Sequence, residues 1–398
     1  MKDVSYLANK PIAILGGGAA GRTHAADCKL GGAEVRLYEH PEFADSLGCI
    51  AHDRKITIAG EQMNVNGFQR KGTAELDMVT TDIKEAVSGA GNIVIAQPAV
   101  GFDLLFKRLI PVLEDGQVVH FMTGNFGSLV LRKQMKEMGC DKDIVVGEWT
   151  SQPYGTRIKT QSGVTMPIVE AVYRAVTLKA SAMPASDTDT FIAASQYIPS
   201  LDAVVTRESG DTVLDVCFSN VNPVLHCPGT ILGASVMENF SYLTGKDKYN
   251  FSIYSHAYSP SVAEVQYGFY LEQKKIGKKI GFGISEYKKE EFWSRMSVLG
   301  SELLGPDVKQ VPFDEFCPIF ESTGPFDIKS RYITEDIPVG CCIQAALGKK
   351  FGVETPIIDS MIVLASVMTG IDFKNNCWTL EKIGLDNMTK EEIMNYVR

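Results

Sequence analysis

A glycine-rich turn near the N-terminus constrains the fold more than any other stretch of the sequence. The apolar run Pro11–Leu15 leads into Gly16-Gly-Gly-Ala-Ala-Gly21, and a helical pattern then continues as far as Gly31-Gly32. Glu34–Tyr38 alternates between apolar and polar residues as a strand does, and it ends at Glu39. Strand, glycine turn, helix and strand within roughly 30 residues, closed by an acidic residue, is the pattern of a dinucleotide-binding unit. The sequence therefore predicts an N-terminal Rossmann-type domain built on a parallel sheet.

Each small residue of the turn has a role in holding a pyrophosphate. Gly16 allows the chain to turn sharply, Gly18 lets the backbone approach the phosphates, and Gly21 lets the helix pack closely on the strand. Ala19 and Ala20 stand at the start of the helix, where free N–H groups and a partial positive charge attract phosphate. We therefore expect this turn to bind a dinucleotide. The alternative is a glycine turn that only connects a strand to a helix.

Glu39 indicates which dinucleotide is bound. It lies about 20 residues after the turn, where a carboxylate can accept a hydrogen bond from the adenosine ribose 2′-hydroxyl. A 2′-phosphate would be repelled by this carboxylate, so we expect NAD(H) in preference to NADP(H). His40 follows directly and is able to accommodate a 2′-phosphate, which leaves NADP(H) open.

Polar residues follow three of the apolar runs that are predicted as buried strands. Gln97 and Pro98 come after one run, and Asn125 and Thr150 come after the next two. Ligands of open α/β sheets bind outside the carboxyl ends of the strands. We therefore expect Gln97 and Pro98 to contact the cofactor, and Asn125 and Thr150 to contact a substrate. For Asn125, an ordinary role as a turn or cap residue is equally open.

The length of 398 residues favours two domains. We place the boundary at Pro199-Ser200, so that residues 1–200 form the Rossmann-type domain and residues 201–398 form a mostly α-helical substrate-binding and catalytic domain. The predicted fold class is therefore α/β with a helical C-terminal half. The helical patterns of the second half cover roughly Thr230–Asn239, Ser261–Ile276, Glu290–Leu299, Ile337–Phe351, Thr355–Thr369 and Lys390–Val397.

Charge and cysteine usage exclude several classes of protein. The net charge of −9 is opposite to what binding of nucleic acid or of an anionic membrane surface needs. No apolar run approaches the roughly 20 residues that span a bilayer, and the N-terminus lacks the layout of a signal peptide. Nine scattered cysteines without a CxxC pair argue against a disulfide framework or a zinc site, so no metal is expected. We expect a cytoplasmic enzyme.

His226 is the strongest candidate for acid–base chemistry. It stands between Asn222-Pro223 and Pro228-Gly229, in a segment predicted to be a loop just before a helix. An imidazole suits proton transfer because its pKa lies near neutrality. From the local pattern alone, a histidine with a structural role is slightly favoured. His24 and His120 lie within a predicted helix and a predicted strand, and we expect both to be structural.

Four segments resemble the octopine/nopaline (opine) dehydrogenase family, in the family order and over nearly the whole chain. They are Gly16–Gly21 with Glu39, Asn220-Val-Asn-Pro-Val-Leu-His226, Arg331-Tyr-Ile-Thr-Glu-Asp-Ile-Pro-Val-Gly340 and Gly352-Val-Glu-Thr-Pro356. The resemblance implies a Rossmann domain, a helical opine domain, and an NAD(P)H-dependent reductive condensation of an amino acid with a 2-oxo acid.

The resemblance also implies roles for three residues. His226 matches the catalytic histidine, Asp336 its carboxylate partner, and Arg331 the arginine that holds a substrate carboxylate. A carboxylate beside an imidazole orients the ring and stabilises its charged form, and the planar guanidinium matches a carboxylate. Asp336 could instead only cap the helix that follows it, and Arg331 could be an ion-pair residue between domains.

The sequence thus predicts an opine dehydrogenase that joins an L-amino acid or amine to a 2-oxo acid such as pyruvate, and that oxidises the product in reverse. One alternative is a 2-hydroxy-acid or ketopantoate-type reductase, which reduces an oxo acid without an amine. A more remote alternative is a nucleotide-binding sensor without turnover. The expected partners are small-molecule substrates, and assembly as a homodimer is left open.

Overall fold

The chain forms two compact units. The computed structural model describes residues 2–161, 164–305, 308, 310–315 and 323–398. Unit 1 consists of Met1–Cys217 with Val397–Arg398, and unit 2 consists of Phe218–Tyr396. The boundary expected at Pro199-Ser200 lies inside the first unit, because strand β12 (Thr206–Ser209) pairs in parallel with strand β11 (Thr177–Ala182) of that unit.

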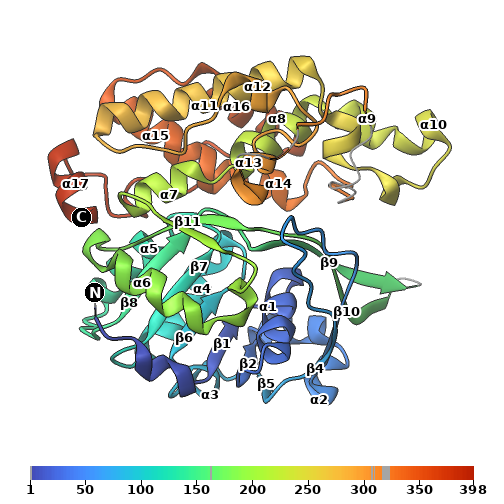
Figure 1. Ribbon diagram of the computed structural model, residues 1–398. Helices are drawn as coiled ribbons and strands as arrows, with labels where there is room; N and C mark the ends of the chain where they lie inside the picture. The colour runs from blue at the N-terminus through green and yellow to red at the C-terminus, as the bar shows by residue number, and fades with distance from the viewer. Residues whose placement is uncertain (1, 162–163, 306–307, 309, 316–322) are drawn as a thin grey trace. The chain divides into compact units, whose positions relative to one another are not determined.

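An eight-stranded sheet is the centre of the first unit (Figure 1). Its strands lie in the order β12-β11-β8-β7-β6-β1-β2-β5. The strands from β8 to β5 are parallel to one another, and their chain order gives the 3-2-1-4-5-6 arrangement of dinucleotide-binding folds. The predicted Rossmann-type fold is confirmed. The strands of this parallel set are β1 (Ile12–Leu15), β2 (Val35–Tyr38), β5 (Met78–Thr80), β6 (Asn92–Ile95), β7 (Val118–Met122) and β8 (Val145–Trp149).

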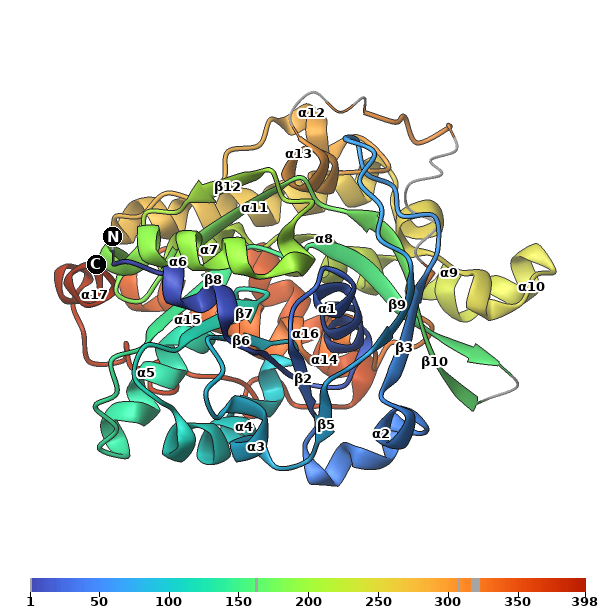
Figure 2. The ribbon, with the colours of Figure 1, turned by 60° about the horizontal axis from the view of Figure 1, so that its bottom comes forward.

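The first helix, α1 (Ala19–Leu30), lies between this sheet and a second one (Figure 2). It contacts β1 and β2 of the central sheet, and it also contacts the four-stranded sheet β4-β3-β10-β9. Residues Gly21–Cys28 are therefore all buried, whereas a surface helix buries only one stripe. The strands of the second sheet are β3 (Lys55–Ala59), β4 (Gly72–Glu75), β9 (Tyr154–Gln161) and β10 (Val164–Arg174).

The other helices of the first unit cover the central sheet. Helix α4 contacts α3 and α5, and α6 contacts β8, β11 and β12. The helices that complete this unit are α2 (Ile50–Asp53), α3 (Ile83–Val87), α4 (Phe102–Leu109), α5 (Gly127–Glu137), α6 (Thr188–Ala194) and α7 (Val213–Ser219), whose last residues belong to the second unit.

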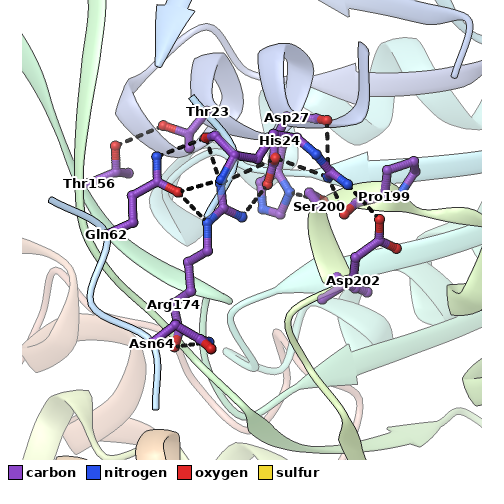
Figure 3. A network of polar contacts seen from close by, with 12 residues as sticks. Thr23, His24, Asp27, Gln62, Asn64, Thr156, Arg174, Pro199, Ser200 and Asp202 are labelled. Atoms are coloured by element: carbon purple, nitrogen blue, oxygen red, sulfur yellow. Dashed lines mark hydrogen bonds and ion pairs between the residues drawn. The ribbon is translucent and has the colours of Figure 1, made fainter. Parts of the chain in front are cut away.

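A buried ion-pair network ties the last turn of α1 to the second sheet (Figure 3). Asp27 and Arg174 have no exposed side-chain surface, and Arg174 Nη1 lies 2.6 Å from Asp27 Oδ2. Gln62 Oε1 accepts a hydrogen bond from Arg174 Nε at 2.6 Å. Arg70 lies 3.1 Å from Asp27 and 2.7 Å from Asp202. Because buried charges persist only when they are paired and hydrogen-bonded, this network fixes α1 relative to the end of β10.

Two buried histidines are structural, as expected. His24 Nδ1 lies 2.8 Å from Ser200 Oγ, and its Nε2 lies 2.9 Å from Gln152 Oε1. His120 Nε2 lies 3.0 Å from Asn92 Oδ1. Burial lowers the pKa of His24 to about 4 and the pKa of His120 to about 3. Both rings are therefore neutral at pH 7.

The second unit is helical, which confirms the expected C-terminal half. Helix α11 (Pro260–Ile280) contacts α8, α12, α15 and α16. In the described part of the chain, no helix is long and apolar enough to cross a membrane. The further helices of this unit are α8 (Asn222–Leu232), α9 (Ala234–Glu238), α10 (Phe240–Thr244), α12 (Lys289–Phe292), α13 (Leu299–Leu304), α14 (Arg331–Thr334), α15 (Cys342–Phe351), α16 (Pro356–Thr369) and α17 (Lys390–Val397).

The prediction of a loop around His226 was wrong. His226 lies inside helix α8, which begins at Asn222 rather than near residue 230. Pro223 is tolerated in the first turn, where the backbone N–H has no partner within the helix. Pro228 lies inside the helix and removes one backbone hydrogen bond. Residues 223–231 are all buried, so tertiary packing outweighs the helix-breaking tendency of Pro228.

Two other predicted helices differ from those observed. Residues 290–299 were expected to form one helix, but α12 ends at Phe292 and α13 begins only at Leu299, with Ser297 at a φ of 45° between the two. The helix expected at residues 337–351 begins as a π-helical turn, η11 (Asp336–Cys341), and continues as α15. A π-turn widens the backbone locally, which changes the direction of its side chains.

Removing one partner of the buried ion pair should destabilise the protein strongly. Arg174→Met leaves Asp27 buried with Arg70 as its only remaining cation in the network, and we expect a loss of about 3–5 kcal/mol in the free energy of unfolding. Urea denaturation measures this loss. Lys2→Met, which breaks the exposed pair with Asp143, is the control and should cost less than about 1 kcal/mol. Similar losses of stability in the two variants would show that the Asp27–Arg174 pair is not a major source of stability.

Lowering the pH below 6.5 should destabilise the first unit. Both buried histidines have depressed pKa values in the folded state, of about 4 for His24 and about 3 for His120. The unfolded chain therefore takes up these protons first, and stability is lost as the pH falls from 6.5 toward 4, by up to about 1.4 kcal/mol per pH unit for each ring. Urea denaturation between pH 7 and pH 5 measures the slope. His24→Gln and His120→Gln should each reduce it, and slopes equal to that of the wild type would count against this account.

Candidate functional site

The glycine turn forms an open cradle at the start of α1. Gly16 has a φ of 114°, which favours glycine. A Cβ on Gly21 would lie 1.7 Å from the carbonyl oxygen of Gly16, so only glycine lets α1 begin this close to the turn. A Cβ on Gly18 would meet nothing within 4 Å, so the backbone there borders open space. Ala19 and Ala20 begin α1 beside this space, and the arrangement fits a pyrophosphate at a helix N-terminus.

A cavity of about 320 Å³ adjoins this turn. The structure brings the sequence-predicted residues Gly16, Gly18, Glu39, Gln97 and Pro98 together on its wall. The rest of the wall is mostly apolar, as is usual for pockets that bind a base or another flat ring. It consists of Gly17, His40, Phe43, Ala96, Val100, Gly101, Leu104 and Leu105.

Glu39 is held in place by backbone N–H groups. Its Oε2 accepts a hydrogen bond from Gly17 N–H, and its Oε1 accepts one from His40 N–H, both at 2.8 Å. Each carboxylate oxygen can accept a further hydrogen bond, so Glu39 can still receive ribose hydroxyls. Arg22, which the sequence analysis missed, donates from Nε to the carbonyl oxygen of Gly17 at 2.7 Å and so braces the same turn. Its position directly after Gly21 is the sequence feature that could have identified it.

Glu148 shapes the loop that carries Asn125. Its side chain is buried on β8, where Oε2 accepts from Asn125 N–H at 2.8 Å and Oε1 accepts from Ser128 N–H at 2.9 Å. These N–H groups lie at the start of α5, so the carboxylate satisfies them as a helix cap would. Burial raises the pKa of Glu148 above its usual range, against the opposing effect of these hydrogen bonds. A single acidic residue within an apolar strand was the signal that sequence reasoning passed over.

Thr150 is placed differently from Glu39 and Gln97. It is fully buried, and its backbone N–H donates to the carbonyl oxygen of Lys179 at 2.9 Å. Its hydroxyl oxygen lies 3.4 Å from Lys179 N. The backbone N–H and the hydroxyl oxygen of Thr150 are thus both hydrogen-bonded to Lys179 in strand β11. The substrate role of Thr150 stays a prediction.

His226 and Asp336 form a buried pair in the second unit. His226 Nδ1 lies 2.7 Å from Asp336 Oδ2, and their side chains are 11% and 6% exposed. Because an ionised carboxylate only accepts, Nδ1 carries a proton, and Nε2 is the nitrogen left to exchange one. The ring of Tyr332 stacks on the imidazole with centroids 3.7 Å apart and an angle of 4°. Tyr332 was not selected from the sequence, although it follows Arg331 directly.

Close packing between α8 and η11 brings the pair together. A Cβ on Gly340 would lie 2.8 Å from Pro223 Cγ, so glycine there allows η11 to approach the first turn of α8. Cys227 and Cys341, one from each element, have their sulfur atoms 3.7 Å apart. Both are free thiols, as are the other six cysteines that the structure describes, and Cys317 lies outside the described residues.

Arg331 begins helix α14, close in sequence to Asp336. Its side chain is 64% exposed, and its Nη2 lies 2.9 Å from Oε2 of Glu335, which is nearly buried. Its Nε donates to the same oxygen at 3.0 Å. In the described part of the chain, no group pairs with Nη1, so one side of the guanidinium remains available for an anion.

The site residues predicted from the sequence fall into two groups. The residues of the glycine turn, Glu39, Gln97, Pro98, Asn125 and Thr150 belong to the first unit, whereas His226, Arg331 and Asp336 belong to the second. Within the described residues, no cluster of three or more histidine, cysteine, aspartate or glutamate side chains could hold a metal ion. The His226–Asp336 pair offers acid–base transfer, and Arg331 offers anion binding.

Comparison with known proteins identifies the family of the helical domain. Residues 209–369 match the family model of the alpha-helical domain of NAD/NADP octopine/nopaline dehydrogenase. The opine dehydrogenase of Arthrobacter sp. (strain 1C) is 26% identical over 397 residues, which cover 98% of this chain and 99% of that protein.

Two solved structures share the fold. Octopine dehydrogenase with NADH and L-arginine gives a TM-score of 0.66 at 18% identity, over 97% of this chain and 98% of that one. Yersinopine dehydrogenase with NADP⁺ bound gives a TM-score of 0.64 at 14% identity, over 98% of this chain and 99% of that one. The matched domain, the relative aligned along the whole chain and the shared fold agree with the resemblance in the sequence. Residues 209–369 thus carry the alpha-helical domain of NAD/NADP octopine/nopaline dehydrogenases, and the chain, which is similar to an opine dehydrogenase over 98% of its length, is an NAD(P)-dependent oxidoreductase.

Proposed function

We propose that the protein is an opine dehydrogenase that condenses the amine of an L-amino acid with a 2-oxo acid such as pyruvate and reduces the product. The observation that carries this proposal is the buried His226–Asp336 pair at 2.7 Å, within the domain that matches the family. The glycine cradle of the first unit supplies the complementary requirement, a place for the dinucleotide. The relatives named above, solved with NADH and L-arginine or with NADP⁺, support the same assignment.

The proposed reaction uses few protein groups. The amine nitrogen attacks the carbonyl carbon of the oxo acid, and loss of water leaves an imine. A nicotinamide cofactor, when bound, would supply a hydride to the imine carbon, and a proton added to the imine nitrogen would complete the secondary amine. Protons must be delivered to the carbonyl oxygen as it leaves as water, and taken from the amine as it attacks. A single residue placed to give and accept protons meets both needs.

His226 is the proposed acid–base residue. The carboxylate of Asp336 keeps the proton on Nδ1, so that Nε2 alternates between its protonated and unprotonated forms. The same carboxylate stabilises the imidazolium that delivers the proton. Tyr332 holds the ring plane from one side, so rotation away from the carboxylate is opposed. In the oxidative direction, Nε2 takes the proton back.

Arg331 is the proposed anchor for a substrate carboxylate. Its Nε and Nη2 are held by Glu335, which fixes the guanidinium plane and leaves Nη1 to meet the anion. An arginine fixed in this way loses less conformational freedom on binding than a free one. Asn125 and Thr150 remain candidates for substrate contacts in the first unit.

NAD(H) is the proposed cofactor in preference to NADP(H). Glu39 is anchored by two backbone N–H groups and can still accept from ribose hydroxyls. A 2′-phosphate would bring two like charges together in a largely apolar cavity, which is unfavourable.

An assay of NADH oxidation tests the proposed reaction. With NADH and pyruvate, we expect oxidation only when the correct L-amino acid is present, and mass spectrometry should detect the condensed product. Oxidation with pyruvate alone would point to a reductase of oxo acids. The absence of oxidation with every pairing of oxo acid and amine would count against an enzyme.

Substitution of the acid–base pair should lower turnover. We expect His226→Ala to reduce kcat by about 10²–10⁴-fold, the usual contribution of general acid–base catalysis. Asp336→Asn should also reduce kcat while NADH still binds, because it removes only the charge that orients the ring. His52→Ala on the exposed helix α2 is the control. A His226→Ala variant that kept most of its kcat would remove this residue from the mechanism.

Because Gly18 borders open space, a substitution there should fold normally but bind the cofactor poorly. Gly18 has a φ of −73°, which any residue adopts, and a Cβ there meets no protein atom. We therefore expect Gly18→Ala to keep the Tm of the wild type and to weaken NADH binding at least about tenfold, because the methyl group stands where the pyrophosphate approaches. Fluorescence titration with NADH measures the affinity. In contrast, Gly21→Ala should lower the Tm as well, and unchanged affinity in Gly18→Ala would rule out this location for the pyrophosphate.

A further inference from the structure

Helix α16 carries apolar side chains on the face that it turns to solvent. Val363, Leu364, Val367 and Met368 are 44%, 40%, 77% and 36% exposed. Residues three and four apart are neighbours on a helix, so these four side chains form one continuous patch, which we call the apolar stripe. A surface helix usually turns polar residues outward, and a contiguous exposed apolar patch marks an interaction site.

A groove of about 940 Å³ adjoins the apolar stripe within the second unit. Its walls come from α15, from α16 and from residues 373–380. Val363 belongs both to the groove wall and to the stripe, so the two form one continuous surface. Together they comprise about 22 residues, within the roughly 20–30 residues a side of a standard protein interface. The surface is therefore large enough for a stable dimer.

The groove walls carry both signs of charge. Lys349 and Lys374 are positive, and Glu354 and Asp359 are negative. In the described part of the chain, none of these four side chains forms an ion pair. The interface of a two-fold dimer must be complementary to itself, and equal numbers of positive and negative groups meet this condition.

The charge of the whole chain also favours this surface for contact between two copies. With a net charge of −9, two copies repel each other at long range. The apolar stripe has no charge and the four charged groups of the groove cancel, so two copies approach here at least cost. A partner of strongly basic or acidic character would find no net charge to bind.

We propose that the apolar stripe and the groove bind a second copy of the chain and form a homodimer through the helical units. The stripe of each copy is then removed from water, and the lysines of one groove face the carboxylates of the other. The proposal goes beyond the proposed function and does not depend on it, because it concerns neither the glycine cradle nor the His226–Asp336 pair.

A charge placed in the stripe should separate the two copies. Val367 is the most exposed residue of the stripe, so Val367→Glu should leave the fold of the chain intact while it brings like charges together at the interface. In sedimentation velocity of the whole chain, we expect a dimer for the wild type at micromolar concentrations. The dissociation constant of the Val367→Glu dimer should be at least about a hundredfold higher.

Val205→Glu makes the same change at a residue of the first unit that is 68% exposed, and this control should remain dimeric. A second measurement is the Tm, which should rise with protein concentration for the wild type and for Val205→Glu but not for Val367→Glu. A wild type that sediments as a monomer at high micromolar concentrations would overturn the proposal. So would a Val367→Glu variant that is as dimeric as Val205→Glu.

Reversal of the two lysines tests the charged part of the surface. Lys349→Glu with Lys374→Glu leaves only negative charges on the groove, so it should weaken the dimer at least about tenfold, and less at high salt, which screens the repulsion. Lys107→Glu with Lys136→Glu makes the same change in net charge on α4 and α5 of the first unit and is the control. Equal weakening by the two pairs would overturn the assignment of the interface to the groove.

Discussion

The close approach of helix α1 to the turn before it is the constraint on which the first unit depends. A side chain at Gly21 would lie 1.7 Å from the carbonyl oxygen of Gly16, so glycine alone permits this contact. The contact sets where α1 begins, and therefore where its free N–H groups face the open space beside Gly18. The other end of the helix is fixed by a different interaction, the buried pair of Asp27 and Arg174. A steric constraint at one end and an ionic one at the other thus define the axis of a helix that lies between two sheets.

The sequence predicted the first unit well, because its central strands are buried on both faces. Such strands appear as continuous apolar runs, and the runs at residues 92–96, 117–122 and 144–149 coincide to within one residue at each end with β6, β7 and β8. The interactions that hold these elements in place were not predictable. Asp27 and Arg174 are 147 residues apart in the chain, and nothing local to either residue names its partner. Glu148 was missed for a similar reason, since the N–H groups that it caps lie 20 and 23 residues earlier in the chain, at the start of α5.

In the helical unit, the paired residues were easier to predict than the local structure that holds them. The resemblance named His226 and Asp336, and the structure places them 2.7 Å apart, but the segment around His226 was predicted as a loop. The two prolines of α8 suggest a break, whereas burial on all sides keeps the helix intact. Asp336 reaches the ring because a π-turn begins there and because Gly340 allows close contact with Pro223. Both features depend on packing, which a local pattern cannot express.

The histidines of this chain show how a partner on one ring nitrogen decides the use of the other. At His226 the partner is a carboxylate, which accepts from Nδ1 and stabilises the charged ring, so Nε2 is free to gain and lose a proton. At His40 the partner is a backbone N–H, which donates to Nδ1, so the ring proton lies on Nε2. At His24 both nitrogens are hydrogen-bonded and burial holds the pKa at about 4, so the ring stays neutral near pH 7. The sequence places a histidine in each of these positions, and the partner of one ring nitrogen distinguishes the proposed acid–base residue His226 from the structural residue His24.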